Sequence, residues 1–239
     1  MSGHSKWKNI LHKKEKTDGQ RAKIFTKIAR EISVAVKEGG GDPNSNYKLK
    51  DILAKARANN VPNDNIKRVI EKASGADGVA YESITYEGYG CKGIAVIVEA
   101  MTDNKNRTAS DVRHYFDKYG GNLGTSGSVA WMFDRLGVIV IENAGLDEDQ
   151  LMLDALEAGA SDVQIQDEVF EIYTQPEDFG AVSEALEGKK YAFLNAQVEL
   201  VPQTSVTLDD PDDIKNITKM LELMEENEDI LDIYHNWNE

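Results

Sequence analysis

The sequence predicts an α+β protein: an N-terminal three-helix domain followed by two α/β domains of the ferredoxin-like split βαβ type, one inserted into the other. Apolar residues recur at helical spacing in the first third of the chain, and strand-like and helix-like segments alternate in the rest. The tail then supplies a helix and a strand that the second domain lacks. The expected domains are residues 1–76, residues 80–135 together with 204–239, and the inserted residues 136–203.

The first domain shows three helical segments. A helix is predicted from about Gln20 to the Gly39-Gly40-Gly41 run, where glycine ends it. Within it, β-branched residues recur at every fourth position: Ile24, Ile28, Ile32 and Val36. Similar spacing predicts a second helix within 46–60 and a third within 63–74.

The inserted segment has the order strand, helix, strand, strand, helix, strand, which is typical of the ferredoxin-like arrangement. Its expected elements are strand 137–142, helix 147–158, strand 162–166, strand 169–174, helix 177–187 and strand 195–201. The domain around it is expected to combine strand 94–99, helix 108–119, strand 129–133, helix 212–226 and strand 230–235.

Two glycine-rich stretches are expected to be shaped loops. Residues 120–127 lack the Lys-Ser/Thr of a phosphate-binding loop and lead from a helix into a strand, so a long turn with positive φ angles is favoured over a nucleotide site. Residues 87–93 precede a strand rather than opening a helix, and they too are expected to form a loop.

Lysine and arginine concentrate at the N-terminal end. Residues 1–75 contain 17 Lys and Arg against 8 Asp and Glu, whereas residues 76–239 contain 10 against 34. The net charges are +9 and −24. Such an asymmetry favours a nucleic-acid partner for the basic part, although charge that serves only solvation would give the same composition.

The bulk features predict a cytoplasmic protein that does not enter a membrane. The longest apolar runs, 94–98 and 138–141, are too short to cross a bilayer, and the polar, basic N-terminus does not resemble a signal peptide. The single cysteine, Cys91, excludes an internal disulfide and fits a reducing compartment.

The sequence shows no catalytic constellation. The four histidines are scattered and form no metal-ligand pair at helical spacing. A nucleophile pair of Cys91 and His114 stays open, but no neighbour that would activate the thiol is recognisable. We therefore expect a protein that is not an enzyme, with no metal, cofactor or small-molecule substrate.

The basic segment carries the candidate nucleic-acid-binding residues. On a helical wheel of about 100° per residue, four cations lie on the side opposite the isoleucines. They continue a run of lysines and histidines that surrounds Trp7, whose ring could stack on a base. Alternatively, Trp7 could cover the apolar edge of the three-helix domain. The candidates are His4, Lys6, Trp7, Lys8, His12, Lys13, Lys14, Lys16, Arg21, Lys23, Lys27, Arg30 and Lys37.

Several ordered motifs resemble the YebC/PmpR family. They are Ser2-Gly3-His4-Ser5-Lys6-Trp7, Arg21-Ala22-Lys23-Ile24-Phe25-Thr26-Lys27, Tyr86-Glu87-Gly88-Tyr89-Gly90, Thr102-Asp103-Asn104-Lys105-Asn106-Arg107-Thr108 and Gly120-Gly121-Asn122-Leu123-Gly124. One departure is Cys91-Lys92, where the family usually shows Pro-Gly. The resemblance covers essentially the whole chain.

The resemblance implies a bacterial, cytosolic three-domain protein and two possible functions. Family members are usually described as DNA-binding transcriptional regulators. A branch that includes a mitochondrial translational activator implies instead binding to the ribosome, through ribosomal RNA, and help with difficult peptide-bond formation. From the residues alone, a basic arm on an acidic body suits RNA, so both DNA and ribosomal RNA stay open as partners.

Overall fold

The computed structural model describes residues 18–75, 80–165 and 168–238. They form two compact units. One unit consists of the described residues up to Val129 together with Asp209–Ile233, and the other consists of Ala130–Leu208 together with the described residues from Tyr234 onward. Each unit is treated by itself below. Among the described residues, no helix is long and apolar enough to span a membrane.

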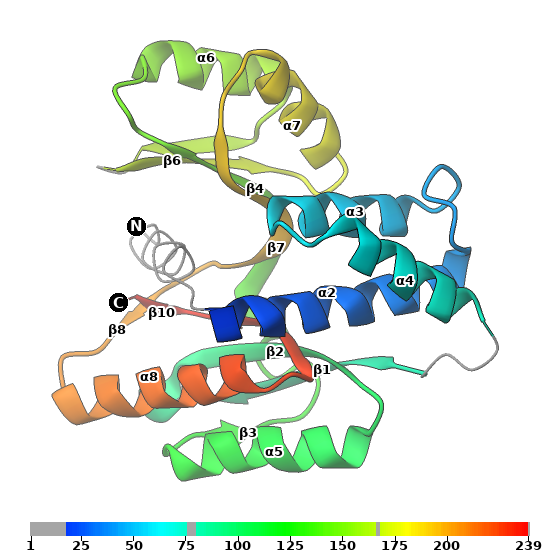
Figure 1. The fold of residues 1–239 in the computed structure, drawn as a ribbon. Helices are drawn as coiled ribbons and strands as arrows, with labels where there is room; N and C mark the ends of the chain where they lie inside the picture. The colour runs from blue at the N-terminus through cyan, green and yellow to red at the C-terminus, as the bar shows by residue number, and fades with distance from the viewer. Residues whose placement is uncertain (1–17, 76–79, 166–167, 239) are drawn as a thin grey trace. The chain divides into compact units, whose positions relative to one another are not determined.

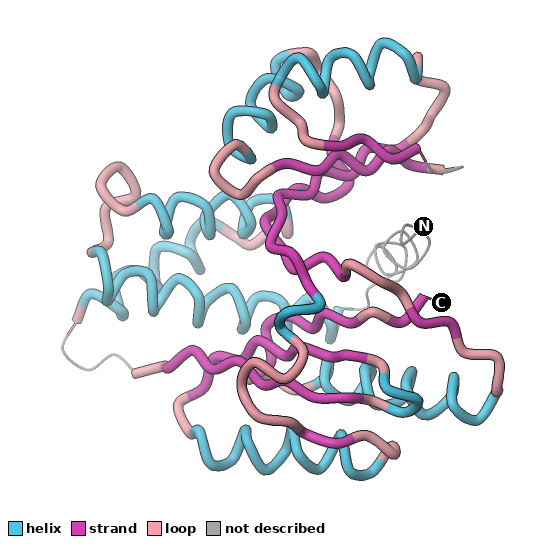
Figure 2. Tube along the Cα trace, turned by 180° about the vertical axis from the view of Figure 1, so that it is seen from behind, coloured by secondary structure: helices cyan, strands magenta, loops and turns pink. Residues whose placement is uncertain are grey.

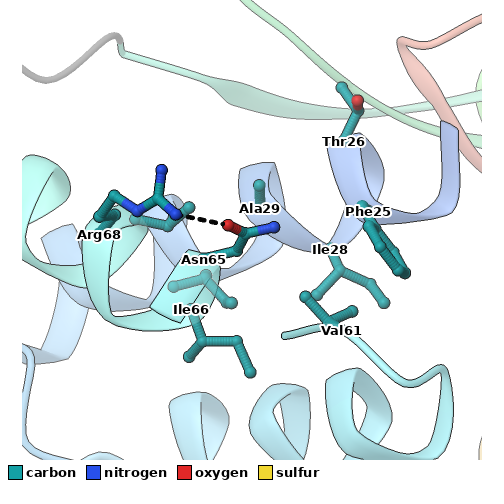
Figure 3. Close-up of a pocket in the computed structure, with 10 residues that line it drawn as sticks. Phe25, Thr26, Ile28, Ala29, Val61, Asn65, Ile66 and Arg68 are labelled. Carbon is teal, nitrogen blue, oxygen red and sulfur yellow. Dashed lines mark hydrogen bonds between the residues drawn. The ribbon is translucent and has the colours of Figure 1, made fainter. Parts of the chain in front are cut away.

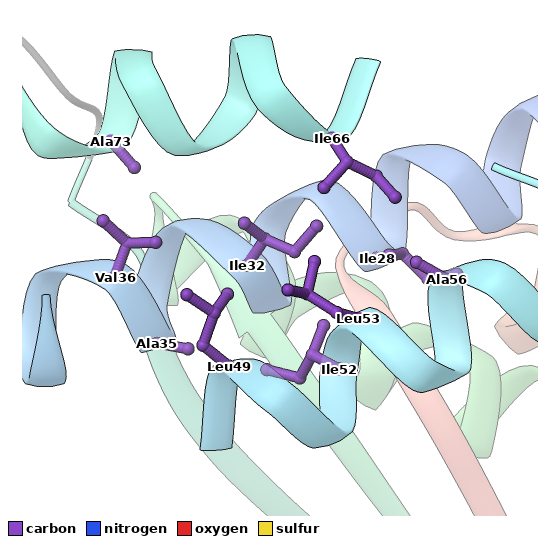
Figure 4. Close-up of a cluster of buried hydrophobic side chains, with 10 residues drawn as sticks. All are labelled: Ile28, Ile32, Ala35, Val36, Leu49, Ile52, Leu53, Ala56, Ile66 and Ala73. Carbon is purple, nitrogen blue, oxygen red and sulfur yellow. The ribbon is translucent and has the colours of Figure 1, made fainter. Parts of the chain in front are cut away.

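The first unit begins with the three expected helices. They are α2 (Asp18–Gly39), α3 (Tyr47–Ala58) and α4 (Asn63–Ser74). Helix α2 packs on both α3 and α4, and its apolar face forms the core drawn in Figure 4. The buried members of this core are Ile28, Ile32, Ala35, Val36, Leu49, Ile52, Leu53, Ala56, Ile66 and Ala73.

A polar side chain fixes the turn between α2 and α3. The Oδ1 atom of Asn46 accepts a hydrogen bond from the backbone nitrogen of Leu49 and caps α3. Its amide nitrogen donates to the carbonyl oxygens of Ala35 and Gly40, each at 2.8 Å. Asn46 is buried, so these bonds satisfy its amide nitrogen inside the protein and connect the start of α3 to the end of α2.

The same unit contains a four-stranded sheet. Its order is β3-β1-β2-β9, built from β1 (Glu82–Tyr89), β2 (Ala95–Thr102), β3 (Asn122–Leu123) and β9 (Ile230–His235). Helices α5 (Lys105–Lys118) and α8 (Pro211–Glu226) contact each other on one face of this sheet, and α2 lies over the opposite face (Figures 1 and 2). The tail therefore completes this sheet, as the sequence predicted.

The second unit contains the ferredoxin-like arrangement. Its elements are β4 (Phe133–Glu142), α6 (Glu148–Ala158), β5 (Asp162–Ile165), β6 (Val169–Thr174), α7 (Phe179–Gly188) and β7 (Phe193–Pro202). The strands pair antiparallel in the order β5-β6-β4-β7. The same unit contains two further short strands, β8 (Val206–Thr207) and β10 (Trp237–Asn238), which pair with each other in parallel. The expected fold class is thus confirmed.

Two sequence expectations were wrong in detail. Residues 129–133 are not a strand: Ala130–Met132 form a 3₁₀ turn, η2, and β4 begins at Phe133. Strand β1 was missed, because its last residues had been assigned to the 87–93 loop. The cause is Glu87, which is only 5% exposed and accepts hydrogen bonds from the backbone nitrogens of Gly127 and Val129. A buried carboxylate breaks the apolar alternation that identifies a strand.

The glycine-rich stretch 120–127 has the positive φ angles that were predicted for it. Gly120 and Gly127 have φ angles of 75° and 83°, the left-handed region that glycine adopts without steric cost. Between them, Asn122–Leu123 pair with the end of β1, where the Glu87 carboxylate holds the following turn. This glycine-rich segment is therefore accounted for by the fold.

Candidate nucleic-acid interface

Most of the predicted interface residues fall outside the described part of the chain. These are His4, Lys6, Trp7, Lys8, His12, Lys13, Lys14 and Lys16. Arg21 is described only as part of the backbone of α2. Lys23, Lys27, Arg30 and Lys37 lie along α2, as the helical wheel predicted, and Lys37 near the end of the helix is exposed.

Two of these α2 cations contact the sheet-containing part of the same unit. The Nζ atom of Lys27 donates to the carbonyl oxygen of Glu225 at 3.3 Å. The Nη1 atom of Arg30 donates to the carbonyl oxygen of Glu228 at 2.8 Å and to Oδ1 of Asp229 at 2.6 Å. Only 12% of the Arg30 side chain is exposed.

This contact corrects the expected role of Arg30. The wheel placed Arg30 opposite the helical core, and we expected that side to face solvent. The structure instead covers it with the end of α8 and the start of β9, so Arg30 is held in a largely buried ion pair. A helical wheel shows which residues share a face, but not that a segment about two hundred positions later will cover that face. Arg30 is accordingly left out of the proposed interface.

Asp229 is the centre of a polar cluster that joins three elements. Its Oδ2 atom accepts hydrogen bonds from Arg107 Nη2 at 2.7 Å, Thr108 Oγ1 at 2.8 Å and Thr102 Oγ1 at 3.1 Å. Burial alone would raise the pKa of Asp229, but the hydrogen bonds from Arg107, Thr108, Arg30 and Thr102 lower it to about 2. The carboxylate is therefore ionised at neutral pH and links α2 to β2 and α5.

A second ion pair lies further along the same side of α2. Lys55 Nζ is 2.9 Å from Glu31 Oε1 and 3.9 Å from Asp232 Oδ2. Burial dominates at Glu31 and raises its pKa, whereas for Lys55 the neighbouring carboxylates of Asp232 and Glu31 outweigh burial and raise the pKa. These charges join α2, α3 and β9.

The cations exposed to solvent in this domain lie mainly on α3 and α4. Lys48 is exposed but lies 2.8 Å from Glu38 Oε2. The other exposed cations on these two helices are Lys50, Arg57, Lys67, Arg68 and Lys72. They extend the basic character of the chain from the N-terminal segment onto the helical domain.

A groove runs between α2 and α4 (Figure 3). Its volume is about 300 Å³, and it is lined by Phe25, Thr26, Ile28, Ala29, Ile32, Val61, Asn65, Ile66, Arg68 and Val69. The floor is apolar, and one edge carries Asn65 and Arg68, whose side chains are joined by a hydrogen bond of 3.0 Å. The sequence did not reveal this groove, because it depends on how two helices pack.

The described residues offer no chemistry that would support catalysis at Cys91. The thiol is buried and donates a weak hydrogen bond of 3.4 Å to the carbonyl oxygen of Asp213. Burial and the nearby Asp213 carboxylate raise the pKa of Cys91, which disfavours the thiolate that a nucleophile requires. Within the described ranges, no group of His, Cys, Asp and Glu side chains could hold a metal ion.

Family models match nearly all of the chain. The model of the TACO1/YebC protein N-terminal domain matches residues 5–76, and the model of the TACO1/YebC second and third domain matches residues 81–237. A "Probable transcriptional regulatory protein" of Acetivibrio thermocellus is 57% identical over 239 residues, which is 99% of each chain. A protein of the same name from Ruminiclostridium cellulolyticum is 56% identical over 241 residues, covering 100% of this chain and 97% of its own.

The fold has a solved relative as well. The crystal structure of a conserved hypothetical protein from Aquifex aeolicus superposes with a TM-score of 0.83 at 41% sequence identity, over 93% of this chain and 92% of that one. Sequence matches over both halves of the chain and a shared architecture agree with each other. The chain belongs to the TACO1/YebC family.

Proposed function

We propose that this protein is a non-enzymatic, nucleic-acid-binding regulator of gene expression. In this proposal residues 1–76 form the binding domain, and the domains formed by 80–135 with 204–239 and by 136–203 form an acidic body. The observation that carries the proposal is the charge division: +9 over residues 1–75 against −24 over residues 76–239. An acidic body is repelled by phosphates, so it confines attraction to the basic end.

The contacts of the helical domain support two different roles for its cations, namely stabilising the fold and contacting phosphates. Arg30 and Lys55 are engaged by carboxylates of the same unit and stabilise the fold. Lys67, Arg68 and Lys72 are exposed on α4, next to the groove edge. These α4 cations, together with the lysines before residue 17, are the ones we assign to phosphate contact.

Two versions of the function differ in the nucleic acid. The names of the relatives support a transcriptional regulator. In the DNA-binding version of this function, α4 would present Asn63, Asn65 and its cations to a groove of the duplex. The charge division supports a ribosomal RNA-binding translation factor in the cytoplasm, because such a factor needs a basic, adaptable arm and a body with little attraction to phosphate. We place transcriptional regulation first on the names of the relatives.

A sedimentation experiment separates these versions. Lysate from cells that express the full chain is run through a density gradient at low and moderate salt, and the protein is located in the fractions. Co-migration with ribosomal subunits that RNase treatment abolishes would support the translation version. Migration as a free protein at both salt concentrations would contradict it and leave duplex DNA as the partner to test.

A direct binding measurement tests the proposal itself. The triple variant K67E/R68E/K72E and the matched control Lys215→Glu, an exposed lysine on the acidic side of the chain, are compared with the unmodified protein. We expect the triple variant to lose affinity for DNA and RNA and the control to keep it. Equal affinity in all three proteins would exclude α4 from the interface.

A further inference from the structure

We propose that the groove between α2 and α4 holds one unstacked base of a single-stranded nucleic acid. This inference rests on the proposed function and adds to it a site and a form of ligand. It makes the helical domain a reader of single strands, and the exposed cations of α4 would hold the backbone on either side of the bound base.

The floor of the groove suits the flat, weakly polar face of a base. Ile28, Ile32, Val61, Ile66 and Val69 line it, and Figure 3 shows Phe25 at one end beside Ile28 and Val61. An aromatic ring at the edge of an apolar slot offers a stacking surface that accepts any base.

Small side chains keep the groove open. Thr26 and Ala29 lie three residues apart on α2, and both line the groove. Residues at this spacing occupy the same helix face, so together they form one wall. A larger side chain at position 29 would occupy part of the groove.

The polar edge can recognise a base. Asn65 Oδ1 accepts from Arg68 Nη2 at 3.0 Å, and in Figure 3 the amide nitrogen of Asn65 points away from Arg68, along the groove. Fixing the oxygen in this way orients the amide nitrogen as a donor, which can meet an acceptor on the edge of a base. The Arg68 bond thus positions Asn65 as well as supplying charge.

The charges beside the groove favour a polyanion. Lys67, Arg68 and Lys72 are exposed on α4, and the carboxylates on the same helix are Asp64 and Glu71. The cations outnumber the carboxylates, and Lys72 lies one helical turn beyond Arg68, so a backbone running along α4 could place successive phosphates near them. A paired base inside a duplex cannot reach the floor of the groove, so the geometry favours single strands.

The test uses the full chain and a single-stranded oligonucleotide carrying the fluorescent base 2-aminopurine, with the duplex of the same sequence as comparison. The variant Ala29→Met fills the groove, and the matched control Ala54→Met places the same side chain on the exposed side of α3. A second groove variant, Phe25→Leu, removes the ring but keeps an apolar side chain, in case Ala29→Met lowers stability in a thermal melt.

We expect the unmodified protein to prefer the single strand and to change the 2-aminopurine emission. Both groove variants should lose affinity for the single strand by roughly 5- to 150-fold, the range for one base stacked on an aromatic residue, and keep their affinity for the duplex. Ala54→Met should behave as the unmodified protein does.

Three outcomes would overturn the inference. If the protein binds single strand and duplex alike and the groove variants do the same, the groove is not a base site, although the proposed function stands. If the unmodified protein binds neither, the proposed function itself fails. If Ala29→Met changes the tryptophan emission of the free protein, and Trp7→Phe abolishes that change, the groove is covered by the chain's own N-terminal segment.

Discussion

Arg30 of the helical domain forms an ion pair with Asp229, which directly precedes strand β9 of the four-stranded sheet, with Arg30 Nη1 2.6 Å from Asp229 Oδ1. The carboxylate also accepts hydrogen bonds from Arg107 and Thr108 of α5 and from Thr102 at the end of β2. One acidic side chain thus accepts hydrogen bonds from four residues on three elements, α2, β2 and α5. Its loss would remove the carboxylate that the two guanidinium groups share.

Asp229→Asn is expected to lower the free energy of unfolding by roughly 3 kcal/mol, because the variant removes the carboxylate charge shared by two guanidinium groups, of which that of Arg30 is largely buried. Chemical denaturation monitored by circular dichroism measures the loss. Asp209→Asn, at an exposed position on the same tail, is the control and should change stability by less than about 0.5 kcal/mol. A similar small loss in both variants would show that the Asp229 cluster contributes little.

The same cluster is expected to make the stability of the protein depend on pH in the acidic range. The pKa of Asp229 is about 2 in the folded protein, below the usual aspartate value of 3.8, so its contribution to stability is present above about pH 4 and disappears as pH falls towards 2. In Asp229→Asn this acid-sensitive component should be missing. Unfolding curves recorded at closely spaced pH values between 2 and 5 would show the difference.

His235 is expected to act at higher pH. Its side chain is half-buried, and burial lowers its pKa from 6.5 to about 4, while a backbone hydrogen bond at Trp237 opposes this shift. Above pH 6.5 the imidazole is neutral in both states. Below it, the unfolded chain binds a proton that the folded protein does not, so the free energy of unfolding falls by about 1.4 kcal/mol per pH unit between 6.5 and 4. His235→Gln should flatten the stability curve in this window. An unchanged slope would mean that His235 can be protonated without cost in the folded protein.

Lys92 adopts a φ angle of 54°, in the left-handed region, within the 3₁₀ turn Cys91–Gly93 (η1). The YebC/PmpR pattern usually has glycine at this position, and glycine has no Cβ to strain there. Lys92→Gly should therefore stabilise the protein by about 0.5–1 kcal/mol, even though it removes the exposed pair with Asp213 at 3.5 Å.

The matched comparison is Gly93→Ala, where φ is 78° and an added Cβ would be strained. It should lower the melting temperature, whereas Lys92→Gly raises it. If Lys92→Gly is destabilising, the pair with Asp213 contributes more than its exposure suggests.

The fold could be predicted from the sequence wherever the spacing of apolar residues within a segment was typical of a single helix or strand. The four-residue spacing of Ile28 and Ile32 and the strand and helix order of 137–201 identified their elements correctly. Strand β1 was missed because the function of Glu87, holding the backbone of Gly127 and Val129, is a long-range contact that no local pattern encodes.

The candidate site could be predicted only in part, because long-range contacts also decide which cations are exposed. Charge counting identified the basic segment, but it could not distinguish two kinds of arginine. Arg30 is largely buried and paired with Asp229, whereas Arg68 is exposed. The groove beside Arg68 required the relative position of two helices. The Thr102–Thr108 motif was recognisable from its resemblance to the family, but the sequence did not show that its threonine and arginine side chains donate hydrogen bonds to Asp229.

The dependence of binding on salt separates the two groups of cations. If the α4 cations contact phosphates, the logarithm of affinity should fall linearly with the logarithm of salt concentration, each contact adding a slope of about −0.9 on duplex DNA or −0.7 on a single strand. The variant K67E/R68E/K72E should reduce the slope by up to about 2 on a single strand while its melting temperature stays unchanged, because all three side chains are exposed. Removing residues 2–17, which contain five lysines, should reduce the slope further.

Arg30→Met, in contrast, should lower stability through the loss of its bond to Asp229 and leave the slope of the folded protein unchanged. A reduced slope in Arg30→Met at a temperature where it is fully folded would return Arg30 to the interface and show that the α2 face opens when nucleic acid binds.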